Sequence, residues 1–330
     1  MVYLAVDSGT TNTMVLLVED GRVTGDARKS VGVRNTSIAG NPSLLRNSLR
    51  ELIESLAKEA PSPPRFVLAA GMITSSLGLL EVRHVVAPAG AEKLSQNVRM
   101  RVFPRVSHLP FFLVPGVRVN RPFCRLSNAD RTDMIRGEET EIVGLLSKRK
   151  HNRPWLLIHL GSHAKAIQVN GRGQIVSSTT TLSGECLQAL QTQTILASKL
   201  ASLKPRELDE RFFFHGLRCA KRNGLLRACF TVRLLEENPR HRPTELYSFL
   251  VGALLFSDLH AFESRGFLNS RKTPILLSGQ PRLLAAWQLL LRKKRHDVEI
   301  VTRQERIAAF LAGLRTIVFA SPVFRRWQSS

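Results

Sequence analysis

The 330-residue sequence is poor in several residue types: it has four cysteines, two tyrosines and only 26 acidic residues against 48 Lys and Arg. The cysteines lack the CxxC spacing of a metal site and the density of a disulfide scaffold, so we expect reduced, buried thiols at Cys124, Cys186, Cys219 and Cys229. No apolar run reaches the roughly 18–20 residues of a membrane-spanning helix. The start, Met-Val-Tyr-Leu-Ala-Val-Asp, has no basic leader, so a cytoplasmic location and no membrane partner are expected.

The shortage of acidic residues gives a formal net charge of +22. Such an excess favours nucleic acid or an anionic surface as a partner where the charge is clustered. Here residues 1–98 carry 10 Lys and Arg against 9 Asp and Glu, and the rest of the chain carries 38 against 17, scattered along it. The basic C-terminal half leaves nucleic-acid binding open, but no recognisable module supports it, so no nucleic-acid partner is expected.

The composition is otherwise that of a folded protein, with 43% hydrophobic and 22% charged residues. A chain of this length usually divides into two domains, because a single core stops growing at about 250–300 residues. We therefore expect an N-terminal lobe over residues 1–150 and a C-terminal lobe over residues 151–330.

The N-terminal lobe opens with a strand pattern. Two short apolar segments flank the polar turn Asp7-Ser8-Gly9-Thr10-Thr11-Asn12, and Asp20-Gly21 marks a tight turn before a third strand. Leucines and an isoleucine then recur at helical spacing over residues 42–60, and a buried strand follows at 66–70. This order predicts a three-stranded antiparallel meander, a helix and a further strand, which is an α/β arrangement.

A similar pattern begins after Pro154. Strands are predicted at 155–160, 164–169 and 174–181, and the polar turn Gly161-Ser162-His163 separates the first two. A helix-rich region follows, and the last part of the chain alternates strands and helices. Two halves that open alike, each with a glycine-bearing turn, are typical of a two-lobed phosphate clamp.

The first turn has the chemistry of an anion site. Its glycine lets the backbone approach an anion closely, and its amides and the two threonine hydroxyls can donate to phosphate oxygens. Asp7 can hold Mg²⁺, often through water. Polar turns between strands are also common without any ligand, and it is the second turn that strengthens the hypothesis of a nucleotide site.

The segment Val6-Asp7-Ser8-Gly9-Thr10-Thr11-Asn12 resembles the first phosphate loop of the actin-like ATPase and sugar kinase superfamily. Further segments are similar, in order, to the motifs of one family within it, 2-dehydro-3-deoxygalactonokinase. The most specific are Ala70-Gly71-Met72 and Arg136-Gly137-Glu138-Glu139-Thr140. The similarity extends through residues 71–78, 114–117, 133–141, 161–165, 183–185, 250–253 and 276–279, and so covers essentially the whole chain.

The resemblance implies an α/β fold of two ribonuclease-H-like (actin-like ATPase) lobes with a nucleotide cleft between them. It implies ATP and Mg²⁺ as cofactors and a small-molecule sugar acid as partner. The implied reaction, in galactonate catabolism, transfers the γ-phosphoryl group to the terminal hydroxyl of 2-dehydro-3-deoxy-D-galactonate and yields the 6-phosphate. The sequence leaves open the stereochemistry of the sugar and whether the chain forms a homodimer.

Within this resemblance Asp7 is the candidate metal ligand. Residues expected to contact the phosphates are Asp7, Ser8, Gly9, Thr10, Thr11 and Asn12 in the first turn and Gly161, Ser162, His163 and Lys165 around the second. Ser278 and Gly279 are expected to lie along adenosine at a strand-to-helix turn. Arg136 is the candidate partner of the substrate carboxylate, with Gly71, Met72 and Ser75 lining the sugar pocket.

Phosphoryl transfer needs a carboxylate to accept the hydroxyl proton. Glu138 and Glu139 are the candidates, because adjacent carboxylates at the start of an apolar helix can point one into the cleft and one toward Arg136. The sequence does not say which of them is the base, and Asp133 is the next candidate. Alternatively, both glutamates merely favour a helix N-terminus.

The second turn departs from the family pattern, Pro-Gly-Thr-His followed by Ser-Lys-Trp. Leu160, Ser162, Ala164 and Ala166 replace the Pro, Thr, Ser and Trp of that pattern, whereas Gly161, His163 and Lys165 remain. A few residues after Leu250-Val251-Gly252 the family commonly carries a Glu, where this chain has Asp258 or its neighbours. These departures leave a second hypothesis, a catalytically weakened sugar-acid sensor or regulatory protein on the same scaffold.

Overall fold

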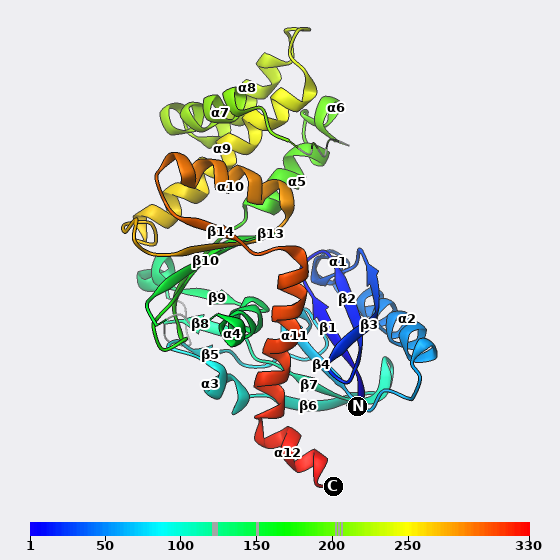
Figure 1. Cartoon of the computed structure of the whole chain (residues 1–330). Coiled ribbons are helices and arrows are strands. Elements are labelled where there is room, and N and C mark those ends of the chain that lie inside the picture. Colours follow the sequence, from blue (N-terminus) through cyan, green and yellow to red (C-terminus); the bar gives the residue numbers. More distant parts are fainter. Residues whose placement is uncertain (121–124, 150–151, 202, 204, 206) are drawn as a thin grey trace. The chain divides into compact units, whose positions relative to one another are not determined.

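The chain forms two compact units in a computed structural model that describes residues 1–120, 125–149, 152–201, 203, 205 and 207–330 (Figure 1). Unit 1 comprises Met1–Arg153, Val169–Ser178 and Gln304–Ser330, and unit 2 comprises Pro154–Gln168 and Thr179–Arg303. The boundary thus differs from the expected single division at residue 150, because the C-terminal segment belongs to unit 1.

Close helix packing explains the return of the C-terminus to unit 1. Helix α4 (Glu138–Lys148) lies against α11 (Arg303–Phe319) at two glycines. A Cβ atom on Gly144 would lie 1.7 Å from the carbonyl oxygen of Ala309, and one on Gly313 would lie 1.9 Å from that of Thr140. The two backbones therefore approach as closely as glycine allows, and α11 is fixed on the helix that begins at the Glu138–Glu139 pair.

Unit 1 is built on a six-stranded sheet with the order β3-β2-β1-β4-β7-β6. Strand β1 is almost wholly buried, and it pairs antiparallel with β2 and parallel with β4. The predicted antiparallel meander is therefore confirmed. The strands are β1 (Val2–Ser8), β2 (Thr13–Glu19), β3 (Arg22–Lys29), β4 (Val67–Gly71), β6 (Arg99–Phe103) and β7 (Ser107–Leu113).

A smaller three-stranded sheet, β5-β8-β9, leads into α4. Its strands are β5 (Val85–Val86), β8 (Val117–Val119) and β9 (Asp133–Ile135). Helix α2 follows the predicted leucine pattern and buries Leu49, Leu52 and Leu56 against the large sheet. The other helical elements of this part of the chain are α1 (Val33–Ala39), α2 (Ser43–Glu59), η1 (Met72–Thr74), α3 (Ala91–Ser95), η2 (Leu126–Arg131) and α12 (Pro322–Gln328).

The second large sheet has the order β12-β11-β10-β13-β14. Its central strand β10 pairs parallel with β13, so that His159 lies opposite Ser278 and Leu160 opposite Gly279. The order is that of the first sheet, with β10 in the place of β1 and β13 in the place of β4. The strands are β10 (Trp155–Leu160), β11 (Ala164–Val169), β12 (Ile175–Thr181), β13 (Ile275–Gly279) and β14 (Val298–Ile300).

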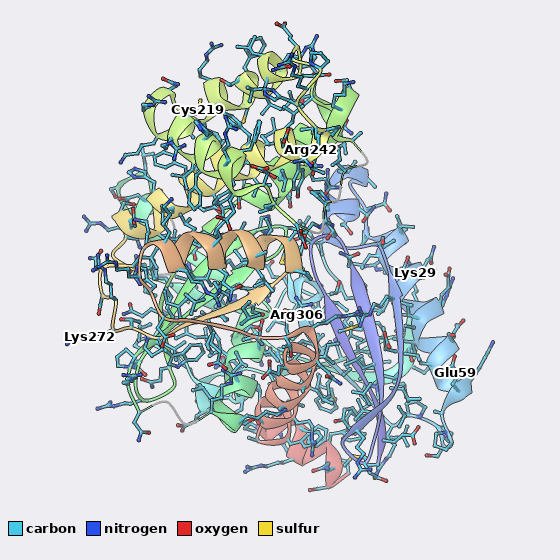
Figure 2. All side chains as sticks on the ribbon, turned by 45° about the horizontal axis from the view of Figure 1, so that its top comes forward. Lys29, Glu59, Cys219, Arg242, Lys272 and Arg306 are labelled. Carbon is cyan, nitrogen blue, oxygen red and sulfur yellow. The ribbon has the colours of Figure 1, made fainter. Side chains whose placement is uncertain are left out.

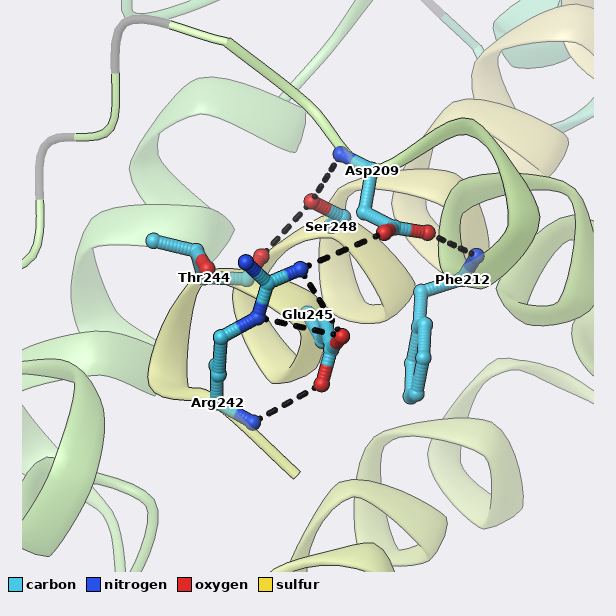
Figure 3. Close-up of polar contacts among 6 residues, drawn as sticks. All are labelled: Asp209, Phe212, Arg242, Thr244, Glu245 and Ser248. Atoms are coloured by element: carbon cyan, nitrogen blue, oxygen red, sulfur yellow. Dashed lines mark hydrogen bonds and ion pairs between the residues drawn. The ribbon is translucent and has the colours of Figure 1, made fainter. Parts of the chain in front are cut away.

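Helices make up most of unit 2, as the sequence predicted. They are α5 (Ser183–Gln193), α6 (Ala197–Leu200), α7 (Glu210–Asn223), α8 (Leu225–Leu235), α9 (Pro243–Ser264) and α10 (Pro281–Lys293). Asp209 caps α7 by accepting the Phe212 N–H at 2.9 Å, and Arg242 bonds to Glu245 at the start of α9 (Figure 3).

Helix α9 corrects one sequence prediction, because its 22 residues are long and apolar enough to span a membrane. Its most apolar 18-residue window is 72% buried within the structure, which is the burial of a core helix. Gly252 lets it approach α7 closely, since a Cβ there would lie 1.9 Å from the carbonyl oxygen of Phe213. The bent pair α11 and α12, with 75° between its members, also passes the length and composition test.

The excess positive charge is spread over separate elements. Figure 2 labels cations on β3 (Lys29), at the start of α9 (Arg242), in the segment before β13 (Lys272) and in α11 (Arg306).

The prediction of buried thiols holds for Cys229, whereas Cys219 is half-buried and Cys186 is exposed. Cys124 lies outside the described residues.

Candidate active site

The first turn, residues 7–12, follows the carboxyl end of β1. The Gly9 N–H donates to the Asn12 carbonyl at 2.8 Å, so this amide closes the turn itself. The Ser8 side chain is fully buried and its hydroxyl lies 3.0 Å from that of Thr13. Thr10 and Thr11 are half-buried and Asn12 is exposed. Of the residues whose hydroxyls are expected to meet phosphate, Thr10 and Thr11 are therefore partly exposed, and the Thr11 hydroxyl accepts a hydrogen bond from the Asn12 side chain at 2.9 Å.

Glycine at position 71 is required by close backbone packing at the end of β4. Its φ is +86°, and a Cβ atom would lie 2.5 Å from the Ser8 carbonyl oxygen and 3.4 Å from Oδ1 of Asp7. Any side chain here would collide with the first turn. The carboxylate of Asp7, which is half-buried, thus lies beside the backbone of Gly71 at the carboxyl ends of two parallel strands, where α/β sheets commonly bind ligands.

The start of α4 meets the same place through Gly137. This residue has a φ of +113°, and a Cβ on it would lie 3.3 Å from the Cα of Gly71. The structure therefore brings together Asp7, Gly71 and the Gly137–Glu138 segment, which are far apart in the sequence. We call this contact of β1, β4 and α4 the glycine junction.

Both glutamates at the start of α4 are buried, Glu138 at 7% exposure and Glu139 at 0%. Both carboxylate oxygens of Glu139 accept the Gly137 N–H at 2.8 Å, and Oε2 of Glu138 accepts the Arg136 N–H at 3.2 Å. These bonds satisfy amides near the helix N-terminus.

Burial, and after it the charge of the neighbouring Glu138, together raise the pKa of Glu139 to about 7, against the lowering effect of hydrogen bonds to backbone amides and of Arg136. Glu139 is therefore partly protonated near neutral pH. Perturbed carboxyl groups of this kind concentrate at functional sites.

Arg136 is buried and braces the segment after β4. Its Nη1 donates to the carbonyl and hydroxyl oxygens of Thr74, each at 2.6 Å, and its Nη2 donates to the Val82 carbonyl at 3.0 Å. Nη2 also lies 3.0 Å from Nε2 of His84, and burial together with the Arg136 charge lowers the pKa of His84 to about 4. The sequence could not reveal these partners, since they lie more than 50 residues away. The expected contact with a substrate carboxylate stays a prediction.

Two further predicted residues lie within four positions after Gly71. Met72 begins the short helix η1 and is half-buried, and the Ser75 hydroxyl donates to the Met72 carbonyl at 2.7 Å. Arg136 bonds to Thr74, which lies between Met72 and Ser75, and so holds this segment in place. Asp133, at the start of β9, instead accepts a hydrogen bond from the Ser178 hydroxyl in β12, and this bond involves neither glutamate of α4.

The second turn, residues 161–163, follows β10 as the first turn follows β1. Its Gly161 N–H donates to the His163 carbonyl at 3.3 Å, and the Ser162 carbonyl accepts the Glu185 N–H at 2.9 Å. Gly184 is required there, because a Cβ would lie 2.2 Å from the Gly161 carbonyl oxygen. The start of α5 is therefore packed directly on this turn.

His163 lies within hydrogen-bond distance of a carboxylate of α5. Its Nε2 lies 3.1 Å from Oε1 of Glu185, and both side chains are partly exposed, at 22% and 31%. Lys165 lies in β11 and is half-buried. The sequence did not predict that Gly184 and Glu185 contact the second turn. The available signal was that both lie in a segment similar to the family's motifs.

The predicted adenosine segment lies at the end of β13. Ser278 is fully buried, and Gly279 has a φ of +129°. A Cβ on Gly279 would lie 2.0 Å from the Leu160 carbonyl oxygen, and the following Gln280 N–H donates to that oxygen at 2.8 Å. The structure therefore brings Gly279 to the residue that precedes the second turn, as it brings Gly71 to the residues of the first.

The donor set limits how a metal could be held. Among the described residues there is no group of three or more His, Cys, Asp and Glu side chains placed to hold a metal ion. Asp7 fits Mg²⁺ in the manner usual for nucleotide enzymes, in which one or two carboxylates bind it and phosphate oxygens and water complete the shell. Residues that fit ATP phosphates are the accessible threonines of the first turn and the backbone and Ser162 of the second.

A cavity of about 610 Å³ lies in unit 1, away from the glycine junction. It is lined by α3, the carboxyl-terminal half of α4, residues 171–174 and Thr316 of α11. None of the predicted site residues lines it. We place the candidate site at the glycine junction and not at this cavity, because the carboxylates and close backbone contacts lie there.

Two solved structures are similar to this chain in overall fold. One is a protein from Sinorhizobium meliloti that is provisionally named 2-dehydro-3-deoxygalactonokinase, with 20% identity, a TM-score of 0.72, and coverage of 95% of this chain and 98% of its own. Another is the activator of 2-hydroxyisocaproyl-CoA dehydratase from Clostridium difficile with bound ADPNP, with 13% identity, a TM-score of 0.50, and coverage of 100% and 97%. None of the curated proteins matches the chain significantly.

The matching sheet orders, the glycine-bearing turns and these structural likenesses define the fold as that of the actin-like ATPases and sugar kinases, which confirms the predicted fold class. Within this class the chain belongs to the 2-keto-3-deoxy-galactonokinase family, whose model matches residues 7–317. The resemblance found in the sequence is thereby confirmed, and the chain is a member of a family of sugar kinases.

Proposed function

We propose that this protein uses Mg·ATP to phosphorylate the terminal hydroxyl of 2-dehydro-3-deoxy-D-galactonate, giving the 6-phosphate, and that it acts in the cytoplasm in galactonate catabolism. The observation that carries the proposal is the glycine junction, which brings Asp7 at the carboxyl end of β1 and the start of α4, with its two buried glutamates, to the backbone of Gly71. Membership of a sugar kinase family supports the reaction class.

The proposed step is a direct transfer. The terminal hydroxyl oxygen of the sugar acid forms a bond to the γ-phosphorus while the bond from that phosphorus to the bridging oxygen breaks. ADP departs with the electron pair, and a carboxylate of α4 accepts the hydroxyl proton. When bound at Asp7, Mg²⁺ would neutralise phosphate charge, which is the main demand of phosphoryl transfer together with positioning.

We assign the base to Glu138. Glu139 directs both of its oxygens to the Gly137 N–H and has no exposed surface, whereas Glu138 keeps 7% exposure. In this assignment Glu139 holds the turn into α4 and so positions its neighbour. Asp133 is the weaker candidate, because its hydrogen bond joins it to Ser178.

The remaining roles are those that the family motifs imply. Thr10, Thr11 and Asn12 would contact the transferred phosphoryl group, and Gly161, Ser162, His163 and Lys165 the β- and γ-phosphates. Ser278 and Gly279 would lie along adenosine. Arg136, together with Gly71, Met72 and Ser75, would shape the sugar pocket, and its cationic group is the proposed partner of the substrate carboxylate.

A coupled assay of ADP release, run over a panel of sugar acids, tests the proposal. We expect stoichiometric ADP with 2-dehydro-3-deoxygalactonate, and loss of that release in Asp7→Asn, because an amide binds Mg²⁺ far more weakly than a carboxylate does. Full activity of Asp7→Asn would refute the metal assignment. No ADP release with any sugar acid of the panel would overturn the proposed reaction.

The altered second turn supports one alternative. Ala164 and Ala166 are buried in the core of unit 2, where the family pattern has Ser and Trp, so this strand lacks the usual aromatic side chain. A weakened kinase that serves as a sugar-acid sensor would bind the sugar acid without turnover. Calorimetry with 2-dehydro-3-deoxygalactonate, beside the ADP assay, separates a sensor from an enzyme.

A further inference from the structure

Helix α9 carries a buried carboxylate that the proposed reaction does not use. Asp258 is 2% exposed, and it is the one carboxylate among the buried residues of α9, whose other buried members are mostly Leu, Val, Ala and Phe. Burial raises its pKa to about 6, so keeping it ionised at neutral pH costs folding free energy. A buried carboxylate that lowers stability is a candidate for a functional role.

The partners of Asp258 lie at the passage from β12 into α5. The Thr181 hydroxyl donates to Oδ1 of Asp258 at 2.6 Å, and the Ser183 hydroxyl is also hydrogen-bonded to this carboxylate. Thr181 is the last residue of β12 and Ser183 the first of α5. Asp258 therefore fixes both sides of the single residue that joins the strand to the helix.

The next two residues of α5 hold the second turn. Gly184 packs on the Gly161 carbonyl, and the Glu185 N–H donates to the Ser162 carbonyl at 2.9 Å. The Glu185 carboxylate lies 3.1 Å from Nε2 of His163. A continuous set of contacts thus runs from Asp258 through Thr181 and Ser183 to all three residues of the second turn.

We propose that Asp258 is a positioning residue for nucleotide phosphates: it sets the start of α5, and α5 in turn sets the backbone of the second turn. The inference rests on the proposed function, since it takes the second turn to bind the phosphates of ATP. Asp258 itself touches neither substrate nor nucleotide in this account. Its loss should therefore weaken nucleotide binding more than it slows the chemical step.

The test compares Asp258→Asn with the wild type in KM for ATP, in kcat, and in ADP affinity by calorimetry. An amide can accept one hydroxyl but presents N–H groups to the other, so KM for ATP and the Kd for ADP should rise about tenfold, which is about 1.4 kcal/mol, while kcat changes less than about threefold. Thr181→Val, which removes one donor only, should shift the same constants in the same direction by a smaller factor.

Asp209→Asn is the matched control, because Asp209 is a carboxylate of the same unit whose bonds cap α7 (Figure 3). It should lower the melting temperature and leave KM for ATP and the Kd for ADP unchanged. Equal nucleotide constants in wild type, Asp258→Asn and Thr181→Val would overturn the inference, as would an equal rise of KM in Asp209→Asn. If the wild type itself bound neither ATP nor ADP, the proposed function would fail instead.

Discussion

In unit 1 the turn after β1 lies beside a glycine of β4 and the start of α4, whereas in unit 2 the turn after β10 lies beside a glycine of β13 and the start of α5. The strand order and the positions of the glycines agree, but the acids do not. Unit 1 gathers Asp7, Glu138 and Glu139, and unit 2 has Glu185 paired with His163. One backbone arrangement thus carries different side chains in the two units, and the proposed roles, metal and proton transfer in unit 1 and phosphate binding in unit 2, rest on that difference.

The largest expected effect is on catalysis and comes from the acids of unit 1. Glu138→Gln should lower kcat by about 10²–10⁴-fold, the range typical of a lost general base, with little change in the far-ultraviolet circular dichroism. Steady-state kinetics at saturating ATP and sugar acid measure this. Glu139→Gln, which keeps one acceptor for the Gly137 N–H, should lose less activity, and the reverse order would exchange the two assignments.

The glycines of the two units should matter equally, because both are needed for the backbone contact. Gly71→Ala and Gly279→Ala should each lower the free energy of unfolding by about 3 kcal/mol or more, since strain at positive φ adds to a Cβ placed 2.5 Å or 2.0 Å from a carbonyl oxygen. Denaturant unfolding measures both.

Gly224→Ala is the control for these glycines, because its φ is also positive, at +81°, but nothing lies within 4 Å of its Cβ. It should cost only the backbone strain, about 1–3 kcal/mol. A loss in Gly279→Ala no greater than that in Gly224→Ala would show that the close contact in unit 2 is not as described.

Glu139 in unit 1 and Asp258 in unit 2 should each make the free energy of unfolding fall as pH rises, over different pH ranges. The pKa of Glu139 rises from 4.5 unfolded to about 7 folded, so the folded protein binds the extra proton and stability from this residue falls as pH rises between these values. Asp258 should do the same between pH 3.8 and about 6. Between pH 4 and pH 8 the free energy of unfolding should fall less in Glu139→Gln than in wild type. The difference between the two falls should be on the order of 3 kcal/mol.

The contrast in this pH experiment lies in the window. The difference between wild type and Asp258→Asn should be complete by about pH 6, whereas that between wild type and Glu139→Gln should still grow up to about pH 7. Parallel curves for wild type and either variant would contradict the burial of that carboxyl in its ionised form.

The smallest expected effect concerns the ion pair of the second turn. His163 and Glu185 are partly exposed, and exposed pairs contribute about 0–1 kcal/mol, so His163→Gln should lower the free energy of unfolding by less than about 1 kcal/mol. Thermal unfolding measures this. A larger loss would show that the pair holds α5 on the turn more firmly than the glycine contact does.

Much of the fold followed from local patterns in the sequence. The strands at 155–160 and 164–169 and the helix over 42–60 agree with β10, β11 and α2, because apolar periodicity and turn residues determine such elements. The three-stranded sheet was missed, since its strands are two or three residues long and pair over distances that no local pattern reveals. The expected lobe boundary missed the return of α11, which depends on the Gly144–Ala309 contact.

The site was predictable only as a set of candidate residues. The motifs identified Asp7, Gly71 and Glu138 as candidates. Why glycine is needed beside Asp7, at Gly71, and beside Glu138, at Gly137, appears only in the backbone contacts of β1, β4 and α4. The bonds of Arg136 to Thr74 and Val82 likewise depend on tertiary structure. Asp258 carried a weak signal, an acid in an apolar helix, and its partners at Thr181 and Ser183 became visible only in the fold.

The most direct test of the central claim is to identify the product by ³¹P nuclear magnetic resonance after the wild-type protein has acted on 2-dehydro-3-deoxy-D-galactonate with Mg·ATP. The account predicts one phosphomonoester at the terminal carbon and an equal amount of ADP, with no such signal from Glu138→Gln in the same time. ADP without a sugar phosphate, or a phosphate on another hydroxyl, would contradict it.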